Sequence, residues 1–305
     1  MSRVVRARRR GVALLAALWL IVVASALGAV ALAMAHAGIN GAANRIQLLR
    51  GEWRAEGCLQ EALASFDDLS RTSSAAEASW VALDSLVRSQ GFLDASCSVT
   101  AAPIGDRLSL ASATAAEVAG YLCSSGVTPA RADSMAAALV DWRDSDDSPM
   151  PLGAERLWYV QHNRRPPNNS PVTSVAELAL VRGFEHRESW TEGLGAEPGR
   201  VWIARAPDRV IAAAAGATET QVAELRARLG RPLTVRDIPA IRETRSRWDR
   251  SACVTADVAT FSDLSDSPDG WKLRATSTLR PSATVEYLLG RVGARAVVAR
   301  RTNWP

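Results

Sequence analysis

The feature that most constrains this chain is an uncharged run of 25 residues, positions 11–35, which follows a short arginine-rich stub. At about 1.5 Å of rise per residue, a helix of this length spans a hydrocarbon core of roughly 30 Å. The arginines at positions 6–10 predict that this end stays in the cytoplasm and that the chain after His36 lies across the membrane. We therefore expect a single-pass membrane protein whose body lies outside the cytoplasm.

A cleaved secretory signal peptide is the alternative for the same residues. The basic start and the small residues at 33–35 fit such a peptide. However, signal peptides have apolar cores of about 7–15 residues, and this run is longer. Apolar residues also continue at mostly helical spacing beyond His36, although Gly51 and Gly57 each weaken a helix by about 1 kcal/mol relative to Ala. We predict one long helix, with its first half in lipid and its second half packed on a soluble body.

The net charge gives no support for binding to nucleic acid. The chain carries +4 in total, but five arginines lie before Val12, so the remainder is near −1. Nucleic-acid binding needs a clustered excess of Lys and Arg. Catalytic signatures are also missing from the sequence, and His162 and His186 have surroundings typical of solvated surface histidines. We assign no catalytic residue.

The body is predicted to be a small α/β unit interrupted by an α-rich block. Turn signals between short apolar stretches indicate strands within residues 91–110, and a helical pattern covers residues 114–245. After Cys253 the pattern alternates again, in three stretches that begin near Trp271, Val285 and Ala294. This alternation is typical of a three-strand antiparallel meander.

The α-rich block contains a faint internal repeat. In each copy a short helix, a glycine turn at Gly126 or Gly216 and a second helix follow one another, which is the order of a helix-hairpin-helix. Such motifs often bind the DNA backbone through turn amides and nearby cations. Neither turn contains Lys or Arg, so a packing unit is the favoured interpretation and a membrane-anchored DNA-binding protein is the alternative function.

The stretch with the strongest indication of a ligand site is an acidic loop that follows the second helix of the first repeat. Ca²⁺ takes about 6–8 oxygen ligands, which carboxylates on one loop can supply. The candidate ligands are Asp141, Asp144, Asp146, Asp147 and Glu155, with only Arg143 opposing them nearby. The spacing is not that of an EF-hand. A solvated helix end with scattered acids is the alternative, and a second acidic stretch, Asp263, Asp266 and Asp269, is interpreted in that way.

Four cysteines allow two disulfides in an oxidising compartment or four buried thiols. None has metal-ligand spacing with a histidine. Three pairings are open, and we would test Cys58 with Cys97 and Cys123 with Cys253 first, because each could tie a helix to the body.

These features together resemble the minor pseudopilin K family of the type II secretion system. The first motif is Arg10-Gly11-Val12-Ala13-Leu14-Leu15, which is similar to the junction that prepilin peptidase cuts after glycine. In major pseudopilins the fifth mature residue is Glu, whereas here it is Ala16. A buried carboxylate in lipid is costly unless it pairs with the N-terminus of a neighbouring subunit. A subunit that lacks this carboxylate needs no neighbour above it, which suits a filament tip.

The second motif is Asp141-Trp142-Arg143-Asp144-Ser145-Asp146, followed by Gly153-Ala154-Glu155 and Tyr159. It is similar to the family's Asp-Trp-x-Asp-x-Asp and Gly-Ala-Glu-Asp run, which lies in a helical insert and binds Ca²⁺. The family's last acid is Arg156 here. A third similarity covers residues 166–169 and 175–184, the family's Pro-rich turn and following helix.

The resemblance implies an α+β, type IV pilin-like fold. A leader (1–11) and a transmembrane helix (12–36) would precede the first part of the body (37–111). A large inserted all-α domain (112–245) and C-terminal strands (246–305) would complete it. The implied role is structural. After cleavage at Gly11 and methylation of Val12, the subunit would join minor pseudopilins I and J at the pseudopilus tip, anchored in the inner membrane with a periplasmic body and a structural Ca²⁺.

Overall fold

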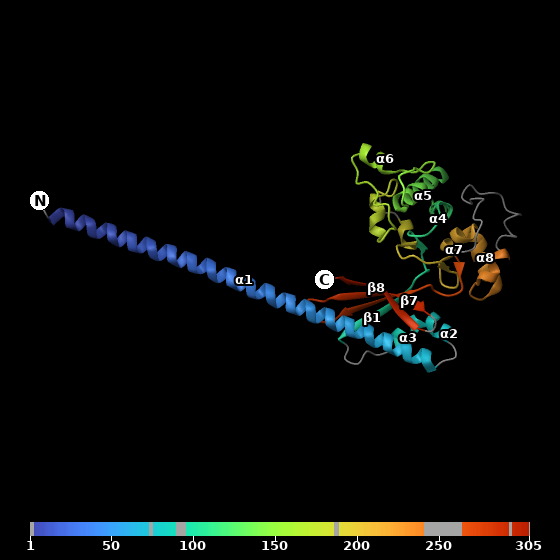
Figure 1. Ribbon diagram of the computed structural model, residues 1–305, viewed down its shortest axis with the longest axis horizontal. Coiled ribbons are helices and arrows are strands. Elements are labelled where there is room, and N and C mark those ends of the chain that lie inside the picture. The colour runs from blue at the N-terminus through green and yellow to red at the C-terminus, as the bar shows by residue number, and fades with distance from the viewer. Residues whose placement is uncertain are drawn as a thin grey trace.

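The computed structural model describes residues 3–72, 76–89, 96–185, 189–240, 264–292 and 295–304. A long helix extends away from a body made of a sheet and a separate helical layer (Figure 1). Along the chain, three helices lead into the first strand, a mainly helical section follows, and the last three long strands close the body. This mixed arrangement of helices and a small sheet confirms the expected α+β class.

Helix α1, Arg3–Thr72, is continuous over 70 residues. Within the described part of the chain it is the helix that is long and apolar enough to cross a membrane, by length and composition. In its first half, the large apolar side chains that the structure describes from Leu14 onward are exposed, among them Leu20, Leu27 and Met34. Apolar side chains that face no protein core are what a lipid-embedded helix requires.

The second half of α1 packs on the sheet. Ala55, Leu59, Ala62 and Phe66 are fully or almost fully buried there. Their spacing of three or four residues puts them on one face of the helix. Gly51 lies so close to the sheet that an added Cβ would meet the Ala283 side chain at 3.1 Å. The glycine that weakens the sequence pattern therefore permits the close approach of helix and sheet.

The main sheet has the order β1-β6-β7-β8 and is antiparallel throughout. Its strands are β1 Cys97–Pro103, β6 Trp271–Ser277, β7 Thr284–Val292 and β8 Arg295–Trp304. In β6, buried residues alternate with more exposed ones, as expected for a sheet with one face covered by α1. The predicted meander is confirmed. Because β1 pairs with β6, Cys97 opposite Ser277, the two ends of the helical section leave and return on neighbouring strands.

The remaining elements are short helices and two small parallel sheets, β2-β3 and β4-β5. The helices beside α1 are α2 Ala76–Val81 and α3 Leu83–Ser89. The helical section contains β2 Leu108–Ser109, α4 Ala115–Ser124, α5 Pro129–Arg143, α6 Arg156–Gln161, η1 Val175–Leu180, η2 Ser189–Gly193, β3 Leu194–Gly195, β4 Val201–Trp202, α7 Asp208–Ala215, α8 Glu219–Leu229 and η3 Val235–Asp237, and β5 is Leu264–Ser265.

The internal repeat predicted from the sequence appears as two similar helix pairs. A short strand, β2 or β4, precedes each pair, and the turns at Gly126 and Gly216 have φ of 93° and 63°. Glycine adopts such positive values without steric strain because it has no Cβ, which explains a glycine in each turn. Thr114 before α4 and Thr218 before α8 both form capping boxes.

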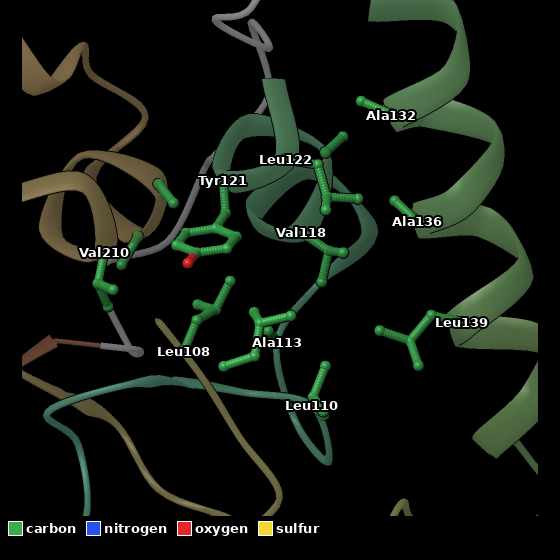
Figure 2. Close-up of a cluster of buried hydrophobic side chains, with 14 of the residues drawn as sticks. Leu108, Leu110, Ala113, Val118, Tyr121, Leu122, Ala132, Ala136, Leu139 and Val210 are labelled. Carbon is green, nitrogen blue, oxygen red and sulfur yellow. The ribbon is translucent and has the colours of Figure 1, made fainter. Parts of the chain in front are cut away.

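The two helix pairs share one core. In Figure 2, Val118 and Leu122 of α4 point toward α5, where Ala132, Ala136 and Leu139 lie. Val210 of α7 lies on the other side of α4, near Tyr121 (Figure 2). This core also includes Leu108 and Leu110, which precede the domain boundary that the sequence suggests at residue 112. That boundary stays a prediction.

A disulfide joins Cys58 of α1 to Cys97 at the start of β1. It is one of the two pairings that we would test first from the sequence. Cys123 is buried in α4, and Cys253 lies outside the described residues, so the second predicted pair is not described. The Cys58–Cys97 bond fixes α1 to the first strand across 39 residues of chain.

Replacing both Cys58 and Cys97 with Ala should lower the free energy of unfolding by about 2–4 kcal/mol, because the unfolded chain regains the entropy of an open loop. Urea unfolding of the full chain in detergent measures this change. In wild type, a reductant should lower the unfolding midpoint by breaking this disulfide, and the double variant should lack that contribution. An unchanged unfolding midpoint would contradict the prediction.

Candidate metal centre

A cluster of three carboxylates lies where α5 ends and α6 begins. Asp141 belongs to the last turn of α5, Asp144 caps its C-terminus and Glu155 directly precedes α6. One oxygen from each carboxylate lies within 4.8 Å of the other two. Thus, the structure brings together three of the five candidate ligands that the sequence suggests.

The other two candidates are not part of this group of three, and their role as ligands stays a prediction. Asp146 and Asp147 are exposed. Asp146 accepts a hydrogen bond from the Ser148 amide, 2.8 Å, and Asp147 accepts one from the Asn169 side chain, 3.3 Å. Sequence spacing alone could not separate them from Asp144, because the loop reverses direction after α5. Their charges still add to the negative field at the cluster.

Packing of the neighbouring aromatic residues fixes the direction of Asp141. Trp142 is fully buried, forms an edge-on contact with Tyr159 at 5.2 Å between ring centroids and donates a hydrogen bond to Glu177, 3.0 Å. With Trp142 anchored in the core, the preceding residue on the helix turns its carboxyl group toward the loop. The Asp141 carboxylate then accepts the Met150 amide N–H at 3.1 and 3.2 Å.

Gly153 allows the loop to close over Asp141. A Cβ atom at this position would lie 1.9 Å from Asp141 Oδ2 and 2.7 Å from its Cγ. Such contacts are far inside van der Waals distance, so a side chain here would push the loop and the carboxylate apart. The glycine in Gly153-Ala154-Glu155 is therefore required by the site, a role that the sequence pattern did not reveal.

The carboxylates lie close together without enough hydrogen bonds to support their charge. Asp144 Oδ1 and both Glu155 carboxylate oxygens are buried and have no hydrogen-bond partner among the described residues. Burial, followed by the charges of Asp141 and Asp144, raises the pKa of Glu155 to about 7. Burial also raises the pKa of Asp141 and of Asp144. Without a bound cation, the folded site at neutral pH thus holds a proton or bears repulsion.

The arginine that the sequence places beside the acids offsets the charge of Asp144 only in part, because its hydrogen bonds go elsewhere. The Arg143 guanidinium turns toward the start of α4, where it donates to the carbonyls of Leu110 and Ala113. Burial lowers the pKa of Arg143. Oxygen atoms close together, buried and unpartnered form a donor set that suits a hard cation such as Ca²⁺.

Arg182 supports the loop from the other side and was not found by the sequence analysis. Its guanidinium donates to the Gly153 carbonyl, 2.8 Å, and to the Ser134 hydroxyl, 3.1 Å. It also lies 5.2 Å from the centre of the Trp158 ring. Its backbone N–H donates to the Tyr159 hydroxyl, 2.9 Å. Residues 175–184, interpreted as a helix, form the short 3₁₀ helix η1 and a turn that place this arginine under the loop.

The remaining predicted residues lie away from this site. Gly11, Val12 and Ala16 belong to the first turns of α1. His162 stacks on Trp158 with centroids 4.1 Å apart, and His186 lies outside the described residues. In the second acidic stretch, Asp269 pairs with Arg200 and Asp266 accepts the Val235 amide, 2.7 Å, while Asp263 lies outside the described residues.

A second surface of functional interest lies on α1 just outside the expected membrane span. Trp53 is 77% exposed, and Ile46 and Leu49 are about half exposed on the same helix. With Leu279 they line a groove of ≈530 Å³ that Arg50 and Arg54 border. A large aromatic residue so fully exposed on a helix is typical of a protein interface.

Comparisons with known proteins bear on the helical domain and on the fold as a whole. Residues 82–189, which include the carboxylate cluster, match the family model described as type II secretion system (T2SS), protein K. No curated protein matches the chain. Among solved structures, a chain of the GspK-GspI-GspJ complex from the enterotoxigenic Escherichia coli type 2 secretion system is similar, with a TM-score of 0.62 and 17% identity over 86% of this chain and 98% of that chain. This likeness confirms the expected pilin-like fold with a helical domain.

Proposed function

We propose that this chain is a type II secretion minor pseudopilin of the K type and that it occupies the tip of the pseudopilus. The observation that carries the proposal is that the segment matching the protein K model, residues 82–189, contains the three-carboxylate cluster within a pilin-like fold that has a helical domain. The helical domain lies on the face of the sheet opposite α1 (Figure 1). Its bulk beside the sheet would obstruct a further subunit stacked above.

The N-terminal residues support the same position. We infer that prepilin peptidase cleaves after Gly11, that the Val12 amine is methylated and that α1 remains in the inner membrane with the body in the periplasm. At the fifth mature position, Ala16 offers no carboxylate to pair with the N-terminus of another subunit. A charge buried in lipid without a partner is costly, so an apolar residue suits a subunit with no neighbour above it.

We infer that the carboxylate cluster holds Ca²⁺ as a structural ion. Asp141, Asp144 and Glu155 would supply ligands, and the ion would replace the missing hydrogen-bond partners of the buried oxygens. The ion would offset the mutual repulsion that raises the pKa of Glu155 and would fix the start of α6 relative to the end of α5. Its contribution is to rigidity, and no chemical step is assigned to it.

We further infer that the groove around Trp53 receives the helix of a partner minor pseudopilin. The solved chain to which this fold is similar comes from a complex with GspI and GspJ, and this supports partners of the same kind here. Trp53→Ala should reduce co-purification of partner minor pseudopilins at least tenfold, because a buried interface Trp often contributes about 2 kcal/mol or more. The melting temperature of the isolated chain should not change, since Trp53 is 77% exposed. Leu157→Ala, at a side chain that is 68% exposed but on α6, is the control and should leave the complex intact.

The experiment that tests the proposed function combines processing and secretion. Intact mass and the N-terminal residue of the protein from native membranes should show a chain that begins at methylated Val12. Deletion of the gene should stop export of secreted proteins, and the full-length gene should restore it. A chain that begins near His36, or normal export after deletion, would overturn the proposal.

A further inference from the structure

The loop over the carboxylate site contains a tight turn whose sequence does not suit its backbone. In Met150-Pro151-Leu152-Gly153, the Gly153 N–H donates to the Met150 carbonyl, 2.8 Å, and Leu152 has a φ of 68°. These are features of a type II turn, in which Pro fits the second position and Gly or Asn is favoured at the third. A leucine in this left-handed conformation is strained.

Burial does not explain the leucine, because its side chain is 61% exposed. Hydrogen bonds from the residues below the turn fix the backbone conformation of Leu152. The Ser134 hydroxyl donates to the Leu152 carbonyl, 3.2 Å, the Met150 N–H donates to Asp141, and Arg182 holds the Gly153 carbonyl. A strained residue whose apolar side chain is mostly exposed to solvent indicates a function outside its own fold.

The leucine does not stand alone. Leu157 and Val160, three residues apart on α6, are 68% and 58% exposed, and Met150 is 36% exposed. Four exposed large apolar side chains thus occur within residues 150–160. Asp146 and Asp147, exposed in the same loop, form no ion pair within the described residues. Apolar side chains next to unpaired acids are complementary to an apolar pocket bordered by Lys or Arg.

We propose that the turn Met150–Gly153 is a docking knob that inserts Leu152 into an apolar pocket, bordered by basic side chains, on a protein outside the minor pseudopilin complex. The proposal rests on the proposed function, since it assumes that the chain works within a secretion apparatus. The knob and α6 lie on the side of the sheet opposite α1, whereas the partner pseudopilins are inferred to pack on α1 (Figure 1). In this proposal, a cation bound beneath the turn would hold the knob in its strained conformation.

The test is Leu152→Asn in the full-length gene at its native locus. Asn adopts a positive φ readily and is polar, so this change relieves strain while it removes the apolar knob. The melting temperature should be at least that of wild type, and the calcium response and the complex with partner pseudopilins should be retained. Export of secreted proteins should nevertheless fall about tenfold, the effect of losing one well-buried apolar anchor.

Matched variants separate docking from general effects. Leu152→Met keeps an apolar side chain and should preserve export. Val292→Asn removes an apolar residue that is 71% exposed at the end of β7 and should leave export unchanged. The double variant Asp146→Asn and Asp147→Asn should reduce export by a smaller factor than Leu152→Asn.

Normal export by the Leu152→Asn strain would overturn the docking proposal and leave the proposed function intact. Loss of the pseudopilin complex in that strain would also overturn it, because the turn would then serve assembly. Failure of the proposed function is a different result, namely normal export after deletion of the whole gene.

Discussion

Removal of calcium from the purified full chain at pH 8 should lower its melting temperature by roughly 5–10 °C. A ligand at about one hundred times its Kd stabilises the folded state by about 2.7 kcal/mol, and 1 kcal/mol shifts the melting temperature of a chain of this size by about 2–4 °C. The physical reason lies in the proposed site, where the buried oxygens of Asp141, Asp144 and Glu155 would lose their shared counter-charge if the ion left. Thermal unfolding with EGTA or with excess Ca²⁺ measures the difference.

The same response should depend on pH. The pKa of Glu155 is raised to about 7 in the metal-free fold, above the ordinary value of 4.5 for a glutamate side chain. Between these values the folded chain holds a proton that the unfolded chain has released, so metal-free stability should fall as pH rises from about 4.5 to 7. Calcium needs the deprotonated site, and its stabilising effect should therefore be larger at pH 8 than at pH 5.5.

Glu155→Gln gives a sharp version of this prediction because it removes one charge and keeps the shape. At pH 8 the metal-free variant should be at least as stable as metal-free wild type, since less repulsion remains, while its response to calcium should be lost. Asp147→Asn is the control, because Asp147 is exposed and outside the cluster, and it should retain most of the response. Equal calcium responses of wild type and Glu155→Gln would refute the assignment of Glu155 as a ligand.

The sequence was most informative where a pattern repeats or a length is limiting. The uncharged run at 11–35 predicted the long α1, and alternation after Trp271 predicted β6, β7 and β8. Glycines at equivalent places in two similar stretches predicted the turns at Gly126 and Gly216. These features arise from backbone and solvent preferences of residues that are close together in the sequence, so the sequence alone can predict them.

The arrangement of the site could be predicted only in part. The acids near 141–155 were found, but which three converge depends on the path of the loop, and that path depends on Arg182, nearly thirty residues away from Gly153. The positive φ of Leu152 could not be predicted, because the sequence favours Gly or Asn in such a turn. Likewise, Gly51 weakened the helix pattern for a reason visible only in the packing against Ala283. The path of the loop, the φ of Leu152 and the role of Gly51 all depend on contacts between residues that are distant in the sequence.

Gly153→Ala should be the most damaging small change in the helical domain. The new Cβ would lie 1.9 Å from Asp141 Oδ2, and neither atom can move freely, since Asp141 follows a buried helical turn and the Gly153 carbonyl is held by Arg182. Relieving such a contact in a packed site costs about 1–3 kcal/mol. It would also displace the carboxylate, so we expect both a lower melting temperature without calcium and a much smaller calcium response.

A second Gly→Ala change serves as a matched control, and its expected effect on the free energy of unfolding has the opposite sign. Gly57 lies on an exposed face of α1, where an added Cβ meets no atom within 4 Å, so Gly57→Ala should stabilise by up to about 1 kcal/mol. A double-mutant cycle then locates the damage at 153. In an Asp141→Ala background the clashing carboxylate is gone, and Gly153→Ala should cost much less than it does in wild type. Equal costs in both backgrounds would mean that Gly153 is needed for the backbone of the loop and not for its approach to Asp141.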